Sequence, residues 1–441
     1  MNMMNDTIAA IATANATGAV SIIRISGEEA ILIASELINK DLSKKEGYTI
    51  TFGTVQEDNE VVDEVLVSIF RAPKSYTGED VVEIGCHGGL FITRKILSLC
   101  LGKGARLARR GEFTERAFLN GKMDLSQAEG VNDLINATDE VNAKSAMHSL
   151  KGSVSKILKP LEEDLTQIIS NSEVNIDYPE YDDVEVLTNQ KIRPKVVSFL
   201  ARIDDIIHKA QNSIIIKNGI NTVILGQPNV GKSSLLNAML QEDKAIVTNV
   251  AGTTRDLVEG EVTLNDVTLN LIDTAGIRDT NDIVEKIGIE KSIEALNNAQ
   301  LVILVCDDKL DEEDKRLLDM AKDKPCLIVY NKKDLHDVKD GINISAINND
   351  IEELVDAIND MFKEEIIDNK MDTLNNERQI GLAISARKHM LDVLKAIDDN
   401  VELDLVSIDL NMAYEDLKEI LGHATREDLL DALFSKFCLG K

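Results

Sequence analysis

The sequence TVILGQPNVGKSS at residues 222–234 indicates the fold class of the residues around it. It passes from an apolar, strand-like run into Gly226-x4-Gly231-Lys232-Ser233 and then into a helical pattern. In this context the pattern forms a phosphate-binding loop, because glycines let backbone N–H groups face a phosphate and the following helix N-terminus adds positive potential. We expect Lys232 to bridge the β- and γ-phosphates of a nucleotide and Ser233 to bind Mg²⁺.

Further motifs follow in the order that a guanine-nucleotide domain requires. The motif DTAG at 273–276 ends the apolar run VTLNLI, and its aspartate can hold Mg²⁺ through water. The motif NKKD at 331–334 follows CLIVY, and Asp334 can accept hydrogen bonds from both N1–H and the exocyclic amine of guanine. Adenine lacks this donor pair, so the motif selects GTP over ATP. A serine and an alanine at 345–346 end the next apolar run, and Thr254 of GTTRD is the expected second protein ligand of Mg²⁺.

The chain divides into regions of different periodicity. Residues 219–345 alternate short runs of valine, isoleucine and leucine with helical segments, which predicts a parallel sheet with crossover helices. The first 120 residues predict an α+β domain, with strands at 20–26 and 65–70 and a helix at 28–38. Apolar residues spaced three and four apart indicate helices from about residue 123 and again beyond about residue 370.

We therefore expect an α/β multidomain chain. An N-terminal α+β domain is followed by a central helical domain, which a Ras-like P-loop G domain interrupts. The expected bounds are 1–120 for the N-terminal domain, 121–217 and 369–441 for the two parts of the helical domain, and 218–368 for the G domain.

The composition excludes several classes of protein. Among 441 residues, 77 are acidic and 48 basic, and the net charge of −29 argues against a sequence-blind nucleic-acid binder, although 94–122 form a local basic stretch. No apolar run reaches the about 18 residues of a membrane span, and the first residues do not resemble a secretory signal. Five cysteines without a CxxC pair are typical of a reduced, cytoplasmic protein without a disulfide frame or a zinc site.

Two residues indicate how GTP would be hydrolysed. Ile277 follows DTAG, where Ras-type enzymes place the glutamine that orients the attacking water, so another residue must hold that water. Asn229 lies inside the phosphate loop, and its amide oxygen can bind a monovalent cation beside the phosphates. Such a cation would supply the charge that an arginine finger supplies elsewhere. The alternative role for Asn229 is a hydrogen bond that braces the loop.

Several longer stretches resemble one known family over essentially the whole chain. They are VSIIRISG at 20–27, SYTGEDVVEIGCHGG at 75–89, RRGEFTERAFLNGKMDLSQAEGVNDLI at 109–135 and the terminal FCLGK at 437–441. These stretches and the nucleotide motifs are similar to those of the bacterial tRNA modification GTPases of the MnmE (TrmE) family. The resemblance implies an N-terminal folate-binding domain that uses a tetrahydrofolate derivative, in its 5-formyl or methylene form.

The resemblance also implies partners and a reaction. Proteins of this family are homodimers that work with the FAD-containing protein MnmG (GidA). Together the two proteins add an aminomethyl or carboxymethylaminomethyl group to C5 of the wobble uridine of certain tRNAs. GTP hydrolysis accompanies this reaction, with Mg²⁺ and K⁺ as cofactors and K⁺-dependent dimerisation of the G domains.

Carried over by motif, the resemblance assigns roles to single residues. Glu285 would orient the attacking water through a second water and act with Lys232 and Asp273 in catalysis. The implied metal ligands are Ser233 and Thr254 for Mg²⁺, and Asn229, Thr248, Val250 and Thr253 for K⁺. The implied folate contacts are Arg24, Glu83, Lys122 and Lys441, and Cys438 matches the near-terminal cysteine of the family. The expected GTP-binding residues are Asn229, Val230, Gly231, Lys232, Ser233, Ser234, Thr248, Asn249, Val250, Ala251, Gly252, Thr253, Thr254, Asp273, Thr274, Ala275, Gly276, Asn331, Lys332, Lys333, Asp334, Ser345 and Ala346.

The residue types at these positions are chemically compatible with a folate, but they do not by themselves identify a folate site. Arginine and lysine suit the glutamate carboxylates of a folate, and a carboxylate suits the donor-rich edge of its pterin. Without the resemblance, Arg24, Glu83 and Lys122 are more typical of surface ion pairs, and Cys438 of a packed thiol. His87 in CHGG is more typical of a structural turn than of a catalytic base.

The chain departs from the family pattern at a few positions. Ile347 follows Ala346 where a lysine or arginine is usual, Arg110 replaces a proline before Gly-Glu-Phe, and Ala19 and Ser21 replace glycines. Two other functions fit the nucleotide motifs. One is a regulatory GTPase of ribosome assembly whose N-terminal domain docks RNA, and the other is a folate-dependent aminomethyl carrier of small-molecule metabolism.

Overall fold

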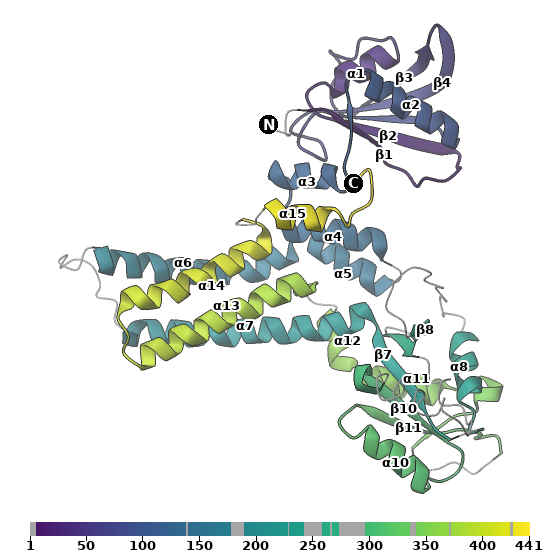
Figure 1. Cartoon of the computed structure of the whole chain (residues 1–441), viewed down its shortest axis with the longest axis vertical. Helices are drawn as coiled ribbons and strands as arrows, with labels where there is room; N and C mark the ends of the chain where they lie inside the picture. The colour runs from purple at the N-terminus through teal and green to yellow at the C-terminus, as the bar shows by residue number, and fades with distance from the viewer. Residues whose placement is uncertain are drawn as a thin grey trace, which may run out of the picture. The chain divides into compact units, whose positions relative to one another are not determined.

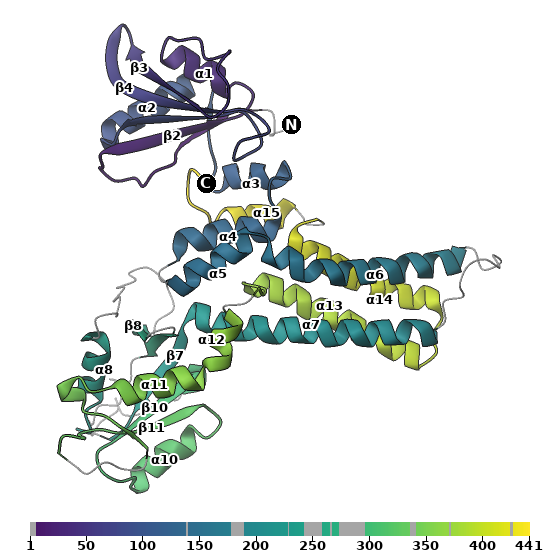
Figure 2. The same ribbon diagram turned by 180° about the vertical axis from the view of Figure 1, so that it is seen from behind.

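The computed structural model divides into two compact units, whose elements are labelled in Figures 1 and 2. The first unit consists of Met1–Thr138, Ala146–Leu200 and Gly381–Lys441, and the second of Asp139–Ser145 and Ala201–Ile380. The residues that the structure describes are 6–137, 140–177, 189–227, 229–241, 258–264, 267–272, 296–335, 341–369, 372–423 and 427–441. Within these ranges, no helix has both the length and the apolar composition needed to cross a membrane.

The first unit begins with a six-stranded sheet in the order β3-β4-β5-β2-β1-β6. Neighbouring strands are antiparallel except β1 and β6, which are parallel. Helices α1 and α2 cover one face of this sheet (Figures 1 and 2), and Ile23, Val67 and Ile84 are buried in the core beneath them. The bounds are β1 Ile8–Ile11, β2 Val20–Ser26, α1 Ala30–Leu37, β3 Thr49–Glu57, β4 Glu60–Phe70, β5 Val81–His87, α2 Leu90–Gly102 and β6 Arg106–Leu107.

Helices form the rest of the first unit. Helix α4 begins at Leu125 because Asp124 and Gln127 form a capping box, in which each side chain accepts a hydrogen bond from the other residue's backbone N–H. Helix α14 packs against α6, and α15 packs against α3. The bounds are α3 Glu112–Leu119, α4 Leu125–Asn136, α6 Ser153–Asp177, α14 Leu403–Leu421 and α15 Glu427–Phe434. Three helices have residues in both units: α5 Glu140–Leu150, α7 Asn189–Asn218 and α13 Glu377–Asp398.

The second unit contains a six-stranded sheet in the order β12-β11-β10-β7-β9-β8. All neighbouring strands are parallel except β8 and β9. One core cluster joins the sheet to α8 and α11, and a second cluster joins its other face to α10, as in doubly wound α/β domains. The bounds are β7 Ile220–Leu225, α8 Lys232–Gln241, β8 Val258–Leu264, β9 Val267–Ile272, β10 Leu301–Cys306, α10 Glu312–Met320, β11 Cys326–Tyr330, β12 Ile342–Asn343, the 3-10 helix η1 Ala346–Asn348, α11 Glu352–Met361 and α12 Lys363–Asn369.

The α/β multidomain class expected from the sequence is confirmed, with differences in detail. The strand expected at 20–26 is β2, and the helix expected at 28–38 is α1, whereas the strand expected at 65–70 is longer because β4 begins at Glu60. The expected parallel sheet has one antiparallel edge strand, β8. Only two residues separate β8 from β9, and a connection that short fits an antiparallel pair but not a parallel crossover.

Candidate functional site

The phosphate-loop sequence leaves β7 at Leu225 and enters α8 at Lys232. Its two glycines have positive φ angles, +147° at Gly226 and +102° at Gly231. A Cβ on Gly226 would collide with the carbonyl oxygen of Val305, and a Cβ on Gly231 would collide with the Asn331 side chain. Both the backbone angles and the close neighbours therefore require glycine at these positions.

The polar side chains of this loop lie at its surface. The Lys232 ammonium donates hydrogen bonds of 2.6 and 2.7 Å to the carbonyl oxygens of Gly226 and Gln227. Ser233 and Ser234, in the first turn of α8, are exposed, and so is Asn229, which has a left-handed φ of +64°. The loop thus presents an amine, hydroxyls and an amide beside the N-terminus of α8, which is the chemistry that phosphates and cations need.

Asn331 connects the guanine motif to the other loops. Its amide nitrogen donates 2.9 Å to the carbonyl oxygen of Val230, and its amide oxygen accepts 3.1 Å from the backbone N–H of Ala346. The side chain is nearly buried, at 5% exposure. One residue thus holds the phosphate loop and the serine–alanine loop at a fixed spacing, and these are the loops that we expect to contact the two ends of GTP.

Asp334 and Ser345 also meet, since the Ser345 hydroxyl donates 2.5 Å to an Asp334 carboxylate oxygen. Asp334 is exposed, so its remaining acceptor positions are open to a base. The hydroxyl therefore orients the carboxylate that we expect to read guanine.

Two lysines brace the same loop. Lys332 has a left-handed φ of +64°, and its ammonium pairs with the carboxylate of Asp307, the residue after β10. The Lys333 ammonium lies 3.3 Å from Asp350 and 3.4 Å from Glu353, and these carboxylates raise the pKa of Lys333. No sequence pattern predicted these acidic partners, because Asp307 follows β10, Asp350 follows η1 and Glu353 belongs to α11.

The parallel strands explain why the separate motifs converge. The carboxyl ends of β7, β10 and β11 lie at one edge of the sheet, where open α/β sheets bind ligands. β9 is parallel to β7 and ends at Ile272, directly before the DTAG motif. The expected switch residues lie outside the described residues, namely Thr248, Asn249, Val250, Ala251, Gly252, Thr253, Thr254, Asp273, Thr274, Ala275, Gly276 and Glu285.

A second candidate site surrounds Arg24 on β2. Its guanidinium donates 2.9 Å to Glu83 of β5 and 3.1 Å to the carbonyl oxygen of Gly440. The rings of Tyr76 and Phe113 lie 5.4 and 5.6 Å from the guanidinium carbon, within cation–π range. Arg24 is therefore held from several sides, and it ties the last residues of the chain to the N-terminal sheet.

The tail enters this site through a tight turn. Gly440 has a φ of +90°, and a Cβ there would collide with the carbonyl oxygen of Ile11. Burial lowers the pKa of the following Lys441, and the charge of Arg24 lowers it further. Cys438 is exposed, and its carbonyl oxygen accepts a hydrogen bond of 3.3 Å from the Gly111 N–H.

The fourth expected folate residue, Lys122, has a different neighbour. Its ammonium donates 2.8 Å to the carbonyl oxygen of Pro73. The structure thus joins Lys122 to the loop that carries Tyr76, whereas Arg24, Glu83 and Lys441 are grouped together. His87 pairs with Asp63, with 2.6 Å between Nδ1 and the carboxylate, and Asp63 also accepts the His87 backbone N–H.

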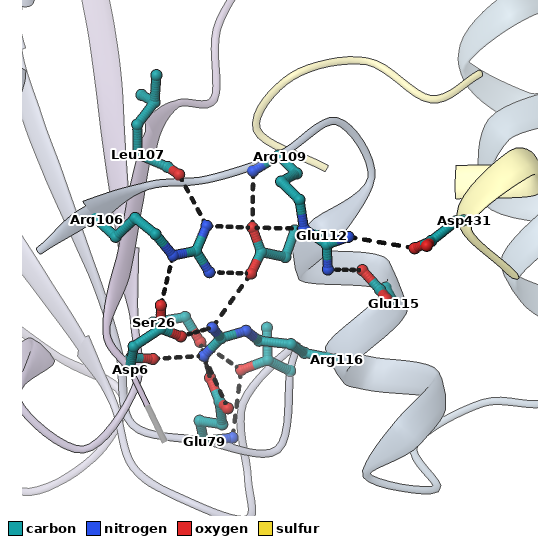
Figure 3. A network of polar contacts seen from close by, with 11 residues as sticks. Asp6, Ser26, Glu79, Arg106, Leu107, Arg109, Glu112, Glu115, Arg116 and Asp431 are labelled. Carbon is teal, nitrogen blue, oxygen red and sulfur yellow. Dashed lines mark hydrogen bonds and ion pairs between the residues drawn. The ribbon is translucent and has the colours of Figure 1, made fainter. Parts of the chain in front are cut away.

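A network of ion pairs, drawn in Figure 3, fixes the start of α3 against β1 and β6. Arg116, at 5% exposure of its side chain, bonds Asp6 at 2.6 Å, Glu79 at 3.2 Å and Glu112 at 3.3 Å. Burial by itself would raise the pKa of Glu112, but hydrogen bonds from Arg106 and the Arg109 backbone outweigh it and keep that pKa below its usual value. In the sequence, the only pattern that indicates this network is the i, i+4 spacing of Glu112 and Arg116.

Comparisons with known proteins agree with this arrangement. The family model described as MnmE helical domain matches residues 125–438, and the one described as GTP-binding protein TrmE N-terminus matches residues 7–122. Proteins called tRNA modification GTPase MnmE are 44% identical to this chain in Bacillus cytotoxicus and 45% identical in Bacillus mycoides. Each alignment covers 99% of both chains.

Among solved structures, a crystal structure of Aquifex aeolicus Era bound to GDP and AlF4⁻ is 24% identical to this chain. It covers 38% of this chain and 66% of its own, with a TM-score of 0.25. The two family models and the full-length relatives indicate the same family. The chain belongs to the MnmE family of tRNA modification GTPases.

Proposed function

We propose that this chain hydrolyses GTP to drive the modification of C5 of the wobble uridine in certain tRNAs. The group added is aminomethyl or carboxymethylaminomethyl, its one-carbon unit comes from a tetrahydrofolate derivative, and the partner is an FAD-containing protein of the MnmG (GidA) family. We propose that the reaction takes place in the cytoplasm. The proposed N-terminal domain spans 1–120, the G domain spans 218–368, and the two parts of the helical domain span 121–217 and 369–441.

One observation supports the proposal most. The chain has two separate groups of polar residues, one at the carboxyl ends of the parallel strands in the second unit and one around Arg24 on the N-terminal sheet. Asn331 and Ser345 organise the first, and Arg24, Glu83 and the Gly440 carbonyl organise the second. A GTPase that only docks RNA has no need of the second site. The 44–45% identity to full-length relatives called tRNA modification GTPases supports the same reading.

In the GTPase step, the side chains bind, orient and stabilise. Lys232 exchanges its hydrogen bonds to its own loop for the β- and γ-phosphates, and Asp334 holds guanine. Ile277 has no hydrogen-bonding group in its side chain, and the family resemblance assigns Glu285 to orient the attacking water through a second water. Asp273, the residue after β9, would hold Mg²⁺ through water.

The exposed loop side chains suit the cations that the proposal requires. Ser233 and Thr254 would hold Mg²⁺, and Asn229, Thr248, Val250 and Thr253 would hold K⁺. When bound, these cations neutralise the charge that develops on the phosphates. The left-handed, exposed Asn229 fits this role, because its amide oxygen is open to a ligand.

The second site suits a folate. Lys441 and Lys122 provide ammonium groups for the glutamate carboxylates, and Glu83 provides a carboxylate for the pterin edge. Arg24 contacts the ligand and also holds Glu83 and the tail in place. Burial of Lys441 strengthens its interaction with a carboxylate, because less water competes for the ammonium.

The N-terminal sheet offers a face for the proposed homodimer. Ile50, Phe52 and Leu66 are 68%, 52% and 54% exposed on β3 and β4. By register and alternation, they share a face with Arg24 and Glu83, opposite the face under α1 and α2. Apolar side chains on one sheet face favour association with a second copy. The G domains of the dimer would meet across their switch regions in a K⁺-dependent manner.

Nucleoside analysis of tRNA tests the proposal. We expect a strain that lacks this gene to lose the modified wobble uridine, and the wild-type gene to restore it. A variant with Asp334→Asn, which impairs guanine binding, should fail to restore it. Unchanged wobble uridine in the deletion strain would refute the proposal and favour a role in ribosome assembly.

The cation assignment has a separate test. GTP turnover of the purified chain should be higher in K⁺ than in Na⁺ by about tenfold or more, because Na⁺ is too small for the same ligand cage. Asn229→Ala should remove the difference while Asn298→Ala, at an exposed position of the same domain, should keep it. Equal rates in the two salts would remove the cation from the mechanism.

A further inference from the structure

Helix α14 is apolar on two faces. Its buried face consists of Val406, Leu410, Ala413, Leu417, Ile420 and Leu421. On the other side, Leu405, Ile408 and Met412 are 54%, 56% and 48% exposed. These three residues, which we call the α14 stripe, are spaced three and four apart and so lie on one face. A helix at a protein surface normally carries polar residues there, so the stripe needs an explanation.

Packing within the chain already uses the opposite face of α14. That face packs against α6 and α4, and Figures 1 and 2 show α14 running alongside α6. The stripe therefore adds nothing to the helical core in this unit. Large apolar side chains that stay in water contribute no burial energy to folding, whereas covering them would stabilise a complex.

The charges beside the stripe define what can cover it. Asp399, Glu402 and Asp404 are exposed near its N-terminal end, and none has an ion pair within the part of the chain that the structure describes. At the other end, the Lys418 ammonium lies 3.3 Å from Glu415 and 5.2 Å from the Tyr414 ring centre, so its charge is engaged locally. The stripe thus has a negative border.

This border disfavours two occupants and favours a third. Nucleic acid would bring phosphates against the carboxylates, and a second copy docked with its α14 parallel would bring the same acids together. A helix with apolar residues three and four apart and basic residues on its flanks would satisfy both the stripe and its border. We propose that the α14 stripe is a docking surface for an amphipathic, lysine- or arginine-flanked helix of a partner protein.

The test uses the full-length chain and a synthetic probe. The probe is a fluorescent helical peptide with leucine at every third or fourth position and lysine on both flanks, and binding is followed by fluorescence anisotropy. We expect Leu405→Asp with Ile408→Asp to weaken binding by about tenfold or more. Glu402→Lys with Asp404→Lys should weaken it to a similar degree and should also reduce its dependence on salt.

Matched variants distinguish binding at the α14 stripe from non-specific binding of the peptide. Leu32 on α1 is 56% exposed, so Leu32→Asp removes an equally exposed leucine elsewhere and should leave binding unchanged. Glu28→Lys serves as the control for the charge reversals, and the helical signal in circular dichroism shows that each variant is folded. A peptide with glutamate in place of lysine should bind about tenfold less tightly.

Three results would overturn the inference. The first is equal peptide affinity in the Leu405→Asp, Ile408→Asp variant, and the second is equal affinity for the glutamate-flanked peptide. The third comes from sedimentation velocity without peptide. Self-association that disappears in this double variant would mean that a second copy covers the stripe.

Discussion

The amide nitrogen of Asn331 lies 2.9 Å from the carbonyl oxygen of Val230, so the guanine motif holds the phosphate loop directly. The same side chain accepts the N–H of Ala346. The two loops that we propose to contact opposite ends of GTP are therefore connected through one buried amide.

Asn331→Ala should weaken GTP binding by about tenfold or more. The substitution leaves a buried carbonyl and a buried N–H without partners, which also costs about 1–3 kcal/mol of stability in the G domain. Titration with a fluorescent GTP analogue and thermal unfolding measure the two effects. Asn298→Ala, at an exposed position, is the control, and unchanged affinity in Asn331→Ala would show that the two loops hold their spacing independently.

Glu285→Ala should lower GTP turnover by about tenfold or more while GTP affinity stays nearly the same. The reason is that a group that orients water acts on the transition state and not on ground-state binding. Glu285 lies outside the described residues, so this prediction comes from the sequence alone. Glu290→Ala is a matched control in the same stretch, and normal turnover in Glu285→Ala would assign the water to another residue.

Gly440→Ala should abolish binding of 5-formyltetrahydrofolate without changing GTP turnover. A methyl group at this left-handed position collides with Ile11 and displaces the tail from Arg24. Gly102→Ala is the control, since a Cβ there meets nothing within 4 Å. Isothermal titration calorimetry measures folate binding, and wild-type affinity in Gly440→Ala would remove the tail from the site.

Arg116→Met should loosen the N-terminal sheet. It removes the cation that Glu79 shares with Asp6 and Glu112, while Arg106 still pairs with Asp6 and Glu112. Because removing one partner of a fully buried ion pair costs about 3–5 kcal/mol, we expect a cost below that range. Hydrogen exchange of the β1 and β2 amides reports this local loss. Arg94→Met, at an exposed position of α2, should leave the exchange rates unchanged, and equal rates in the two variants would deny the network its structural role.

Stability should fall in acid partly through Asp6. The hydrogen bond from Arg106 holds the pKa of Asp6 below its usual value of 3.8. Because the folded-state pKa is the lower one, this stabilisation is complete above the unfolded pKa and is lost as the pH falls through the folded pKa. Asp6→Asn should make the thermal unfolding midpoint depend less steeply on pH below about pH 4. Asp356→Asn is the control, and an unchanged slope in Asp6→Asn would assign the acid loss to other carboxyl groups.

The GTP site could be predicted from sequence further than the folate site. Short motifs on a strand–helix alternation predicted that Lys232, Asn331, Asp334 and Ser345 bind GTP, and the structure brings them to one sheet edge because parallel strands end there together. No local pattern predicted that Asp307 pairs with Lys332, or that Ser345 holds Asp334. Those contacts depend on the spacing of neighbouring strands.

The alternation of elements, the glycine turns and the resemblance to one family could be predicted from residue order, because they depend on patterns over short distances. The hydrogen bond from Arg24 to the carbonyl oxygen of Gly440, 416 positions further along the chain, became visible only in the folded chain. The same holds for the three apolar residues that α14 leaves in water. Contacts of this kind arise when separate elements pack. Local residue order does not predict which surfaces pack together and which remain exposed.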